Sequence, residues 1–258
     1  MIADILIFIK KQVSACVFGI ALLLGIAASH ALWQAEWSFA RYDALLIYAL
    51  IVQVMLVVCK IETWREVRVI ILFHIAGTVM ELFKTSVGSW HYPEENIMRI
   101  MGVPLFSGFM YSAVGSYLAR SWRLFNCNFE HYPKLWFTVF LALAIYINFF
   151  THHYVIDMRY ILIGAIFVLF VRTRLFFSMT NKVYSIPLLI PFVLLALLLW
   201  GAENVATYYN IWLYPYQMEG WKMVSFHKIG SWFLLMLLSF VLVSFLHKPT
   251  LAEKGAIR

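Results

Sequence analysis

The stretch FHKIGSWFLLMLLSFVLVSFL, Phe226 to Leu246, decides the fold class. After Lys228 it contains no charged residue, and it is long enough to cross a bilayer as a helix, which takes roughly 20 apolar residues. The whole chain agrees, because 63% of its 258 residues are hydrophobic and 13% are charged. A soluble domain is about half apolar and a quarter charged. The composition therefore predicts an integral membrane protein.

Seven further apolar runs approach the length of a membrane span. Their continuous Leu, Ile, Val and Phe content favours helices over the alternating pattern of a membrane barrel. We therefore predict an all-α, polytopic membrane bundle of about eight transmembrane helices. The eight runs are Val13–Trp33, Ala44–Cys59, Val67–Phe83, Val103–Leu118, Leu135–Phe150, Val155–Val171, Tyr184–Ala202 and Phe226–Leu246. The first is long for the core of a signal peptide, so we expect it to be retained.

The distribution of lysine and arginine predicts the orientation. With the N-terminus inside, 14 of these residues fall in inner segments and 6 in outer ones, as the positive-inside rule requires. Both termini are therefore predicted to be cytoplasmic, and the net charge of +7 gives no reason to expect a nucleic-acid partner. The inner residues are Lys10, Lys11, Lys60, Arg65, Arg68, Arg120, Arg123, Lys134, Arg172, Arg174, Lys182, Lys248, Lys254 and Arg258.

One pattern occurs twice at an offset of 122 residues. The first motif runs from Glu81 to Pro93 and the second from Glu203 to Pro215, each with the form E-x3-T-x4-W-x-Y-P. Two shorter pairs accompany them: Arg41-Tyr42 with Arg159-Tyr160, and Gly115-Ser116-Tyr117 with Gly230-Ser231-Trp232. Chance matching of short aromatic words is the alternative to duplication.

The offset corresponds to four predicted helices, an even number, so both copies would run in the same direction across the membrane. We therefore predict two parallel four-helix repeats, about 1–130 and 131–258, within a single membrane domain 1–258. The two motifs would then lie at the outer ends of their helices.

The first motif ends a helix with a polar face. His74, Thr78, Glu81 and Thr85 follow helical spacing and share one side. A carboxylate in hydrocarbon costs on the order of 2.5–3.5 kcal/mol, so Glu81 is expected to face protein, water or a partner group. It is either a general acid or proton carrier, or part of an interhelical hydrogen-bond network. Glu203 has a less polar face, so one carboxylate could act as acid while the other stabilises charge; two similar helix caps are the alternative.

The loops add further candidates. Trp90, Tyr92, Trp212 and Tyr214 are typical of an interfacial aromatic belt, and Pro93 followed by Glu94 and Glu95 is typical of a helix N-terminus. The candidate catalytic residues are Glu81, Glu203, His91, His153 and Asp157. The candidate substrate-binding residues are Trp90, Tyr92, Thr85, Thr207, Trp212 and Tyr214.

His153 and Asp157 have the i, i+4 spacing of metal ligands on a helix. With His91, Glu94 and Glu81 they could form a mixed nitrogen and oxygen site. The alternative is a hydrogen-bonded cluster in which Asp157 pairs with Arg159 or Arg41. No three-ligand motif is present, so we predict neither a bound metal nor another cofactor.

Two further patterns concern packing. Gly108, Ser112 and Ser116 form a small-residue face suited to close helix contact. Pro187 and Pro191 predict a kink in the run Tyr184–Ala202.

Five long motifs resemble a bacterial integral-membrane family of unknown function, the YoaT-like family. They are ELFKTSVGSWHYPE, GVPLFSGFMYSAVGSYLARSWR, INFFTHHYVIDMRY, AENVATYYNIWLYP and GSWFLLMLLSFVLVS. The resemblance covers nearly the whole chain and implies a multi-pass protein of the bacterial inner membrane, without implying an activity.

A fainter likeness is to membrane carotenoid cyclases and hydratases, which also place a glutamate near a helix end before a G-x-W/Y-x-Y word. Glu81 and Gly88–Tyr92 match that word, whereas Tyr-Tyr-Asn replaces a glycine before Trp212 and the His-His-Asp loop also departs from it.

Three functions fit these patterns. The first is an intramembrane acid–base enzyme that protonates a C=C bond or hydrolyses a bond in a lipid or isoprenoid at the outer side, among membrane lipids. The second is a small-molecule transporter with its site at the repeat interface. The third is a structural or accessory membrane protein. The nearly apolar inner halves of the runs disfavour a continuous transport path.

Overall fold

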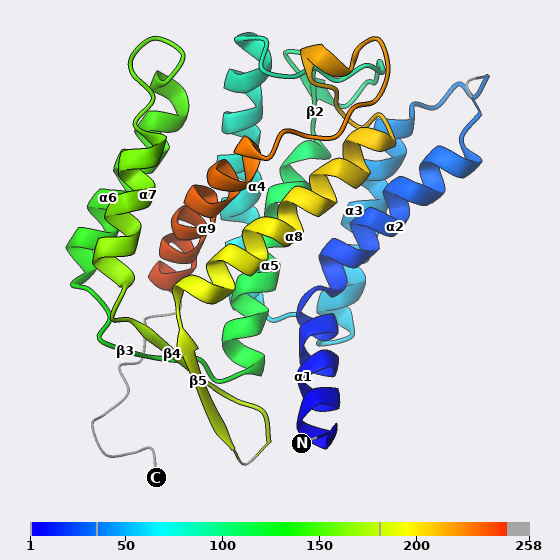
Figure 1. Ribbon diagram of the computed structural model, residues 1–258. Helices are drawn as coiled ribbons and strands as arrows, with labels where there is room; N and C mark the ends of the chain where they lie inside the picture. Colours follow the sequence, from blue (N-terminus) through cyan, green and yellow to red (C-terminus); the bar gives the residue numbers. More distant parts are fainter. Residues whose placement is uncertain (1, 35, 181, 247–258) are drawn as a thin grey trace. The chain divides into compact units, whose positions relative to one another are not determined.

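The computed structural model describes residues 2–34, 36–180 and 182–246, and it is mostly helical (Figure 1). Three of the inner basic residues, Lys248, Lys254 and Arg258, lie outside this part. The chain divides into two compact units, each assembled from separate segments. Unit 1 contains Met1–Ala15, Leu118–Trp200 and Ser225–Arg258, and unit 2 contains Cys16–Tyr117 and Gly201–Val224.

Unit 2 is built around an aromatic and aliphatic core. Phe18 and Leu22 from α2, Tyr42 and Leu45 from α3, and Phe109 from α5 belong to one buried cluster. Burial of these side chains provides the main stabilising energy of the unit. Its elements are α2 (Val17–Leu32), α3 (Arg41–Val58), α4 (Trp64–Ser86), β1 (Arg99–Ile100), β2 (Val103–Pro104), the first part of α5 (Ser107–Leu124), the last turns of α8 (Leu189–Tyr208) and the 3-10 helix η1 (Pro215–Gln217).

Helix α4 has well-defined ends, and these fix the position of Glu81. At its start the Thr63 amide donates to Glu66 Oε2 at 2.6 Å, and the Glu66 amide donates to Thr63 Oγ1 at 3.4 Å, which is a capping box. At its end Gly88, with φ +72°, reverses the chain as the Ser89 amide donates to the Lys84 carbonyl. Glu81 therefore lies in the last turns of α4.

Helices α4 and α5 pack closely within unit 2. A Cβ atom on Gly108 would lie 2.5 Å from His74 Nδ1, and one on Gly77 would lie 2.5 Å from the Tyr111 ring. Ser112 Oγ donates to the Ile70 carbonyl at 2.9 Å. These contacts confirm that the predicted small-residue face is used for close packing.

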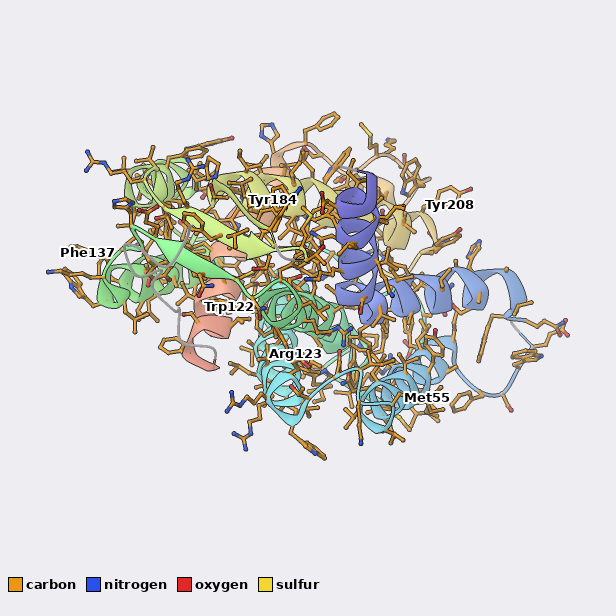
Figure 2. All side chains as sticks on the ribbon, turned by 90° about the horizontal axis from the view of Figure 1, so that it is seen from below. Met55, Trp122, Arg123, Phe137, Tyr184 and Tyr208 are labelled. Carbon is orange, nitrogen blue, oxygen red and sulfur yellow. The ribbon has the colours of Figure 1, made fainter. Side chains whose placement is uncertain are left out.

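Unit 1 combines helices with a small sheet. Helices α6, α7 and α9 pack against one another, and the sheet is antiparallel in the order β3-β4-β5, with Phe129 opposite Leu175. The buried Trp122 ring stacks on Phe240, with centroids 5.3 Å apart, whereas Phe137 on α6 is exposed (Figure 2). Its elements are α1 (Ile2–Ala15), the rest of α5, β3 (Asn128–Glu130), α6 (Leu135–Thr151), α7 (Arg159–Phe170), β4 (Arg174–Ser178), β5 (Val183–Pro187), most of α8, and α9 (His227–Leu246).

Several predicted helices have different bounds in the structure. The run Val13–Trp33 is divided at Cys16, between α1 and α2. The run Tyr184–Ala202 begins as β5, and α8 starts only at Leu189. Pro187 ends this strand and Pro191 lies in the first turn of α8, where no intrahelical donor is needed, so the predicted kink is wrong.

Two other runs start later than predicted. Val103–Leu118 begins with β2 before α5, and Val155–Val171 begins with a loop before α7. The bundle is thus accompanied by short strands, because apolar composition alone does not distinguish a strand from a helix.

By length and composition, three helices in the described part could each cross a membrane. They are α3, α8 and α9, and the bent pair α1–α2 would make a fourth. Two shorter apolar helices are α6, whose 17 residues are at the lower limit for a crossing, and α7, whose 12 residues are below it. The predicted helical character is therefore confirmed, and three or four of the described helices could cross a membrane.

Candidate functional site

The two repeated motifs meet in unit 2. The His91 amide donates to the Leu213 carbonyl at 3.0 Å, and the Leu213 amide donates back to the His91 carbonyl at 2.9 Å. His91 and Leu213 occupy equivalent positions, 122 residues apart. Beside this bridge the rings of Trp90 and Tyr214 pack edge to face, with centroids 6.0 Å apart.

Glu81 is the centre of the first motif, and its side chain is 3% exposed. Its Oε2 accepts hydrogen bonds from Trp90 Nε1 and the Tyr92 hydroxyl, both at 2.7 Å, and its Oε1 accepts one from the Tyr111 hydroxyl at 2.7 Å. An indole N–H can only donate, and a carboxylate that accepts at both oxygens matches the ionised form. This geometry does not favour the predicted role of Glu81 as a proton donor.

The second motif repeats the central pair. The Tyr214 hydroxyl donates to Glu203 Oε1, and both side chains are buried. The spacing of 11 residues from glutamate to tyrosine equals that between Glu81 and Tyr92. Trp212 differs from Trp90, because it packs against the hydrophobic core of unit 2.

The two carboxylates are electrostatically connected. Tyr111, which donates to Glu81, also lies within electrostatic range of Glu203. Lys84 is buried one turn after Glu81 on α4.

Tyr92 and Tyr214 remain protonated near neutral pH. Burial, followed by the charge of Glu81, raises the pKa of Tyr92 well above its ordinary value. Burial and the charge of Glu203 do the same to the pKa of Tyr214. Both phenols are therefore hydrogen-bond donors to carboxylates. We refer to Glu81, Trp90, Tyr92, Tyr111, Glu203 and Tyr214 as the carboxylate–tyrosine centre.

The two motif threonines have another role. Thr85 Oγ1 donates to the Glu81 carbonyl at 2.8 Å, and Thr207 Oγ1 donates to the Asn204 carbonyl at 3.1 Å. Both hydroxyls thus bond to their own helix near its end. Thr207 also accepts from Trp221 Nε1 at 3.2 Å.

His153 and Asp157 belong to unit 1, so the centre is built without them. Residues 152–158 form a turn and loop between α6 and α7, so His153 and Asp157 do not have the geometry of an i, i+4 pair on a helix. Asp157 accepts a hydrogen bond from the Arg159 amide at 2.9 Å and pairs with its guanidinium at 3.2 Å. The predicted pairing of Asp157 with Arg159 is therefore confirmed. Burial alone would raise the pKa of Asp157, but these bonds and one from Asn148 lower it below its usual value. In the described ranges no three His, Cys, Asp or Glu side chains group as metal ligands.

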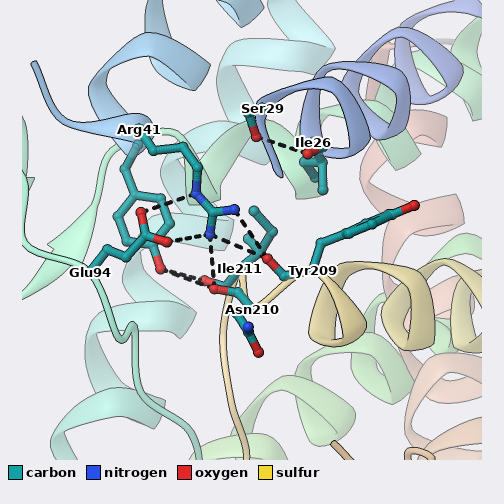
Figure 3. A network of polar contacts seen from close by, with 8 residues as sticks. Ile26, Ser29, Arg41, Glu94, Tyr209, Asn210 and Ile211 are labelled. Carbon is teal, nitrogen blue, oxygen red and sulfur yellow. Dashed lines mark hydrogen bonds and ion pairs between the residues drawn. The ribbon is translucent and has the colours of Figure 1, made fainter. Parts of the chain in front are cut away.

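Arg41 holds the chain next to the centre (Figure 3). Its guanidinium pairs with Glu94 at 2.5 Å and donates to the Tyr209 and Asn210 carbonyls at 3.2 Å. The Tyr42 hydroxyl donates to the Ile211 carbonyl at 2.9 Å. Arg41-Tyr42 thus fixes the part of the second motif that directly follows α8.

The predicted helix N-terminus after Pro93 is wrong. The chain from Pro93 to Met98 forms no helix. Glu94 instead pairs with Arg41, and Glu95 pairs with Arg99. These ion pairs use the charges that would otherwise interact with a helix dipole.

Sequence reasoning missed two polar residues of unit 2. Tyr111 lies 30 positions from Glu81, and no local pattern indicates their contact. Asp43 is 1% exposed and accepts from the Asn96 side chain and from the Ile97 and Met98 amides, each at 2.9 Å. The sequence offered one indication of its role, an aspartate in the first turn of an apolar helix.

Comparison with known proteins agrees with the resemblance found in the sequence. The family described as "Protein of unknown function (DUF817)" matches residues 4–240, which include both motifs. The "Uncharacterized protein YoaT" of Bacillus subtilis (strain 168) is 43% identical over 218 residues, 83% of each chain. No solved structure matches the chain.

Proposed function

Since the chain belongs to the DUF817 family of proteins of unknown function, we propose an activity from its own residues: acid–base catalysis on a lipid or isoprenoid within the membrane. In this proposal the chain crosses the bacterial inner membrane about eight times, in two parallel four-helix repeats, with both termini cytoplasmic. The carboxylate–tyrosine centre then lies towards the outer side.

The observation that carries the proposal is the meeting of two glutamate–tyrosine pairs. Each has the same 11-residue spacing, and a backbone bridge joins equivalent positions of the two motifs. This arrangement supports a local two-fold relation between the motifs, as a gene duplication would produce. Buried ionisable groups within membrane proteins mark functional sites by default.

The chemistry of the centre suits a cationic transition state. Glu81, held by three donors, is placed to stabilise developing positive charge. Glu203 acts as the general acid, and the Tyr214 hydroxyl that donates to its Oε1 stabilises the carboxylate that remains after proton transfer. This proton adds to one carbon of a C=C bond, the other carbon becomes a cation, and a neighbouring C–H returns a proton to Glu203.

Transport is the second candidate, and one observation favours it. Gln53, Glu62 and Ser116 are buried polar residues of unit 2. Gln53 and Ser116 lie in the helix halves that the topology places inside, and Glu62 lies in the turn between α3 and α4 on the same side, a region that was expected to be nearly apolar. A polar path along these helices would serve a transporter.

Comparative mass spectrometry of lipids and isoprenoids tests the enzyme proposal. The strains are a deletion, a wild-type overproducer, and equally expressed Glu81→Gln and Glu219→Gln forms. Glu219 is exposed, so its variant controls for loss of a carboxylate. We expect a species that appears with wild type and Glu219→Gln and disappears with Glu81→Gln.

Identical profiles in all four strains would contradict the enzyme proposal for endogenous lipids. Substrate uptake by vesicles that depends on the protein would then favour transport. If neither a changed lipid profile nor uptake is found, the remaining function is that of a structural or accessory protein.

A further inference from the structure

Another buried carboxylate, that of Glu62, lies apart from the carboxylate–tyrosine centre. It follows α3 in the turn before α4, and its side chain is 2% exposed. Lys60, with φ +57°, reverses the chain, and the Ile61 and Glu62 amides both donate to the Leu56 carbonyl, at 2.9 and 3.0 Å. These bonds hold Glu62 against the last turn of α3.

Two neutral side chains bind the Glu62 carboxylate. The Ser116 hydroxyl donates to Oε1 at 2.5 Å, and the Gln53 amide Nε2 donates to Oε2. Ser116 is 0% exposed and Gln53 is 9% exposed. The three residues come from α3, the α3–α4 turn and α5, so the group connects three elements of unit 2.

The group has no counter-charge among the described residues of unit 2. Across residues 16–34, 36–117 and 201–224, no cationic side chain lies within ion-pair distance of Glu62. The neighbouring N-terminus of α4 is capped by Thr63 and Glu66. A buried carboxylate with only neutral partners is costly unless a cation or a proton balances its charge.

The side-chain oxygen of Gln53 is a candidate ligand for a cation. Its Oε1 is buried and has no hydrogen-bond partner among the described residues, although the same amide group already bonds Glu62. Amide, carboxylate and hydroxyl oxygens are hard ligands that suit alkali and alkaline-earth cations. A single carboxylate matches a single positive charge.

We propose that Glu62, Gln53 and Ser116 form a sodium site at the α3–α4 turn. The ion balances the charge of Glu62, uses the Gln53 carbonyl oxygen, and fixes α3 to α5. This site is independent of the proposed enzyme activity.

Sodium-dependent thermal unfolding of the purified full-length protein tests the proposal, together with direct binding of radioactive sodium. Choline chloride keeps the ionic strength constant, and potassium serves as the competing cation. We expect the unfolding temperature to rise with sodium and saturate, because an ion that binds only the folded state stabilises it. Potassium should give a clearly smaller shift.

Three variants test whether the effect of sodium depends on this site. Glu62→Gln should lose the sodium-dependent shift, while its unfolding temperature without sodium equals or exceeds that of wild type. Ser116→Ala keeps the carboxylate and should need more sodium for the same shift, which provides a test if Glu62→Gln does not fold. Glu81→Gln should retain the full shift, so failure of the enzyme proposal leaves this result unchanged.

Three results would overturn the proposal. One is an equal response to sodium and potassium. Another is a full sodium shift in Glu62→Gln. The third is a wild-type protein that ignores sodium and loses stability as the pH rises, which would show that a proton balances Glu62.

Discussion

Glu81→Ala is expected to lower the free energy of unfolding by roughly 3–5 kcal/mol, because it leaves three donors without their acceptor. Trp90 Nε1 and the Tyr92 and Tyr111 hydroxyls all bond to this carboxylate at 2.7 Å. The loss is measured by chemical denaturation of the purified protein in detergent.

Two variants serve as controls for this loss of stability. Glu219→Ala removes an exposed carboxylate and should change stability by no more than about 0.5 kcal/mol. Glu81→Gln keeps one acceptor oxygen and should fall between wild type and Glu81→Ala. A Glu81→Ala protein as stable as wild type would show that the three donors do not depend on Glu81.

Arg41→Met is expected to cost roughly 2–4 kcal/mol, because it leaves two carbonyl groups without their donor at about 1–3 kcal/mol each. Arg41 is 5% exposed, and its loss leaves the Tyr209 and Asn210 carbonyls without their donor (Figure 3). Methionine keeps the apolar part of the side-chain volume. The loss of stability therefore measures the contribution of the polar contacts of Arg41. The same denaturation experiment measures it.

The control for Arg41 uses its partner. The Glu94 side chain is 37% exposed, so water compensates part of its loss and Glu94→Gln should have a smaller effect. Arg41→Lys should recover only part of the stability, because an ammonium lacks the planar fork that reaches several acceptors. Equal stability of Arg41→Met and Arg41→Lys would contradict this account.

The sequence predicted the central residues of the site better than their partners. Glu81 was identifiable because a carboxylate in an apolar helix needs a buried polar environment, and the recurrence of its motif indicated Glu203, Tyr92 and Tyr214. The contact of Tyr111 with Glu81 depends on how α4 packs on α5, which no local pattern encodes.

The element types were less predictable where apolar runs were short or interrupted. Tyr184 to Pro187 forms β5 because strand pairing with β4 competes with helix formation in this β-favouring segment. Asp157 was expected within a helix only because the apolar run Val155–Val171 begins before it. Its hydrogen bonds with Asn148 and Arg159 stabilise a turn instead.

The central claim is that the two motifs form one centre, and disulfide formation between His91→Cys and Leu213→Cys tests it most directly. These residues exchange both backbone hydrogen bonds, and such pairs have Cα atoms about 5.5 Å apart, within the range of a disulfide. The background replaces Cys16, Cys59 and Cys127 with serine. His91→Cys with Glu219→Cys serves as the control pair.

We predict that mild oxidation in membranes links residues 91 and 213 nearly completely and leaves the control pair reduced, as mass spectrometry of the joined peptides would show. Free thiols at both positions after oxidation, with each still open to alkylation, would contradict the meeting of the motifs and the centre built on it.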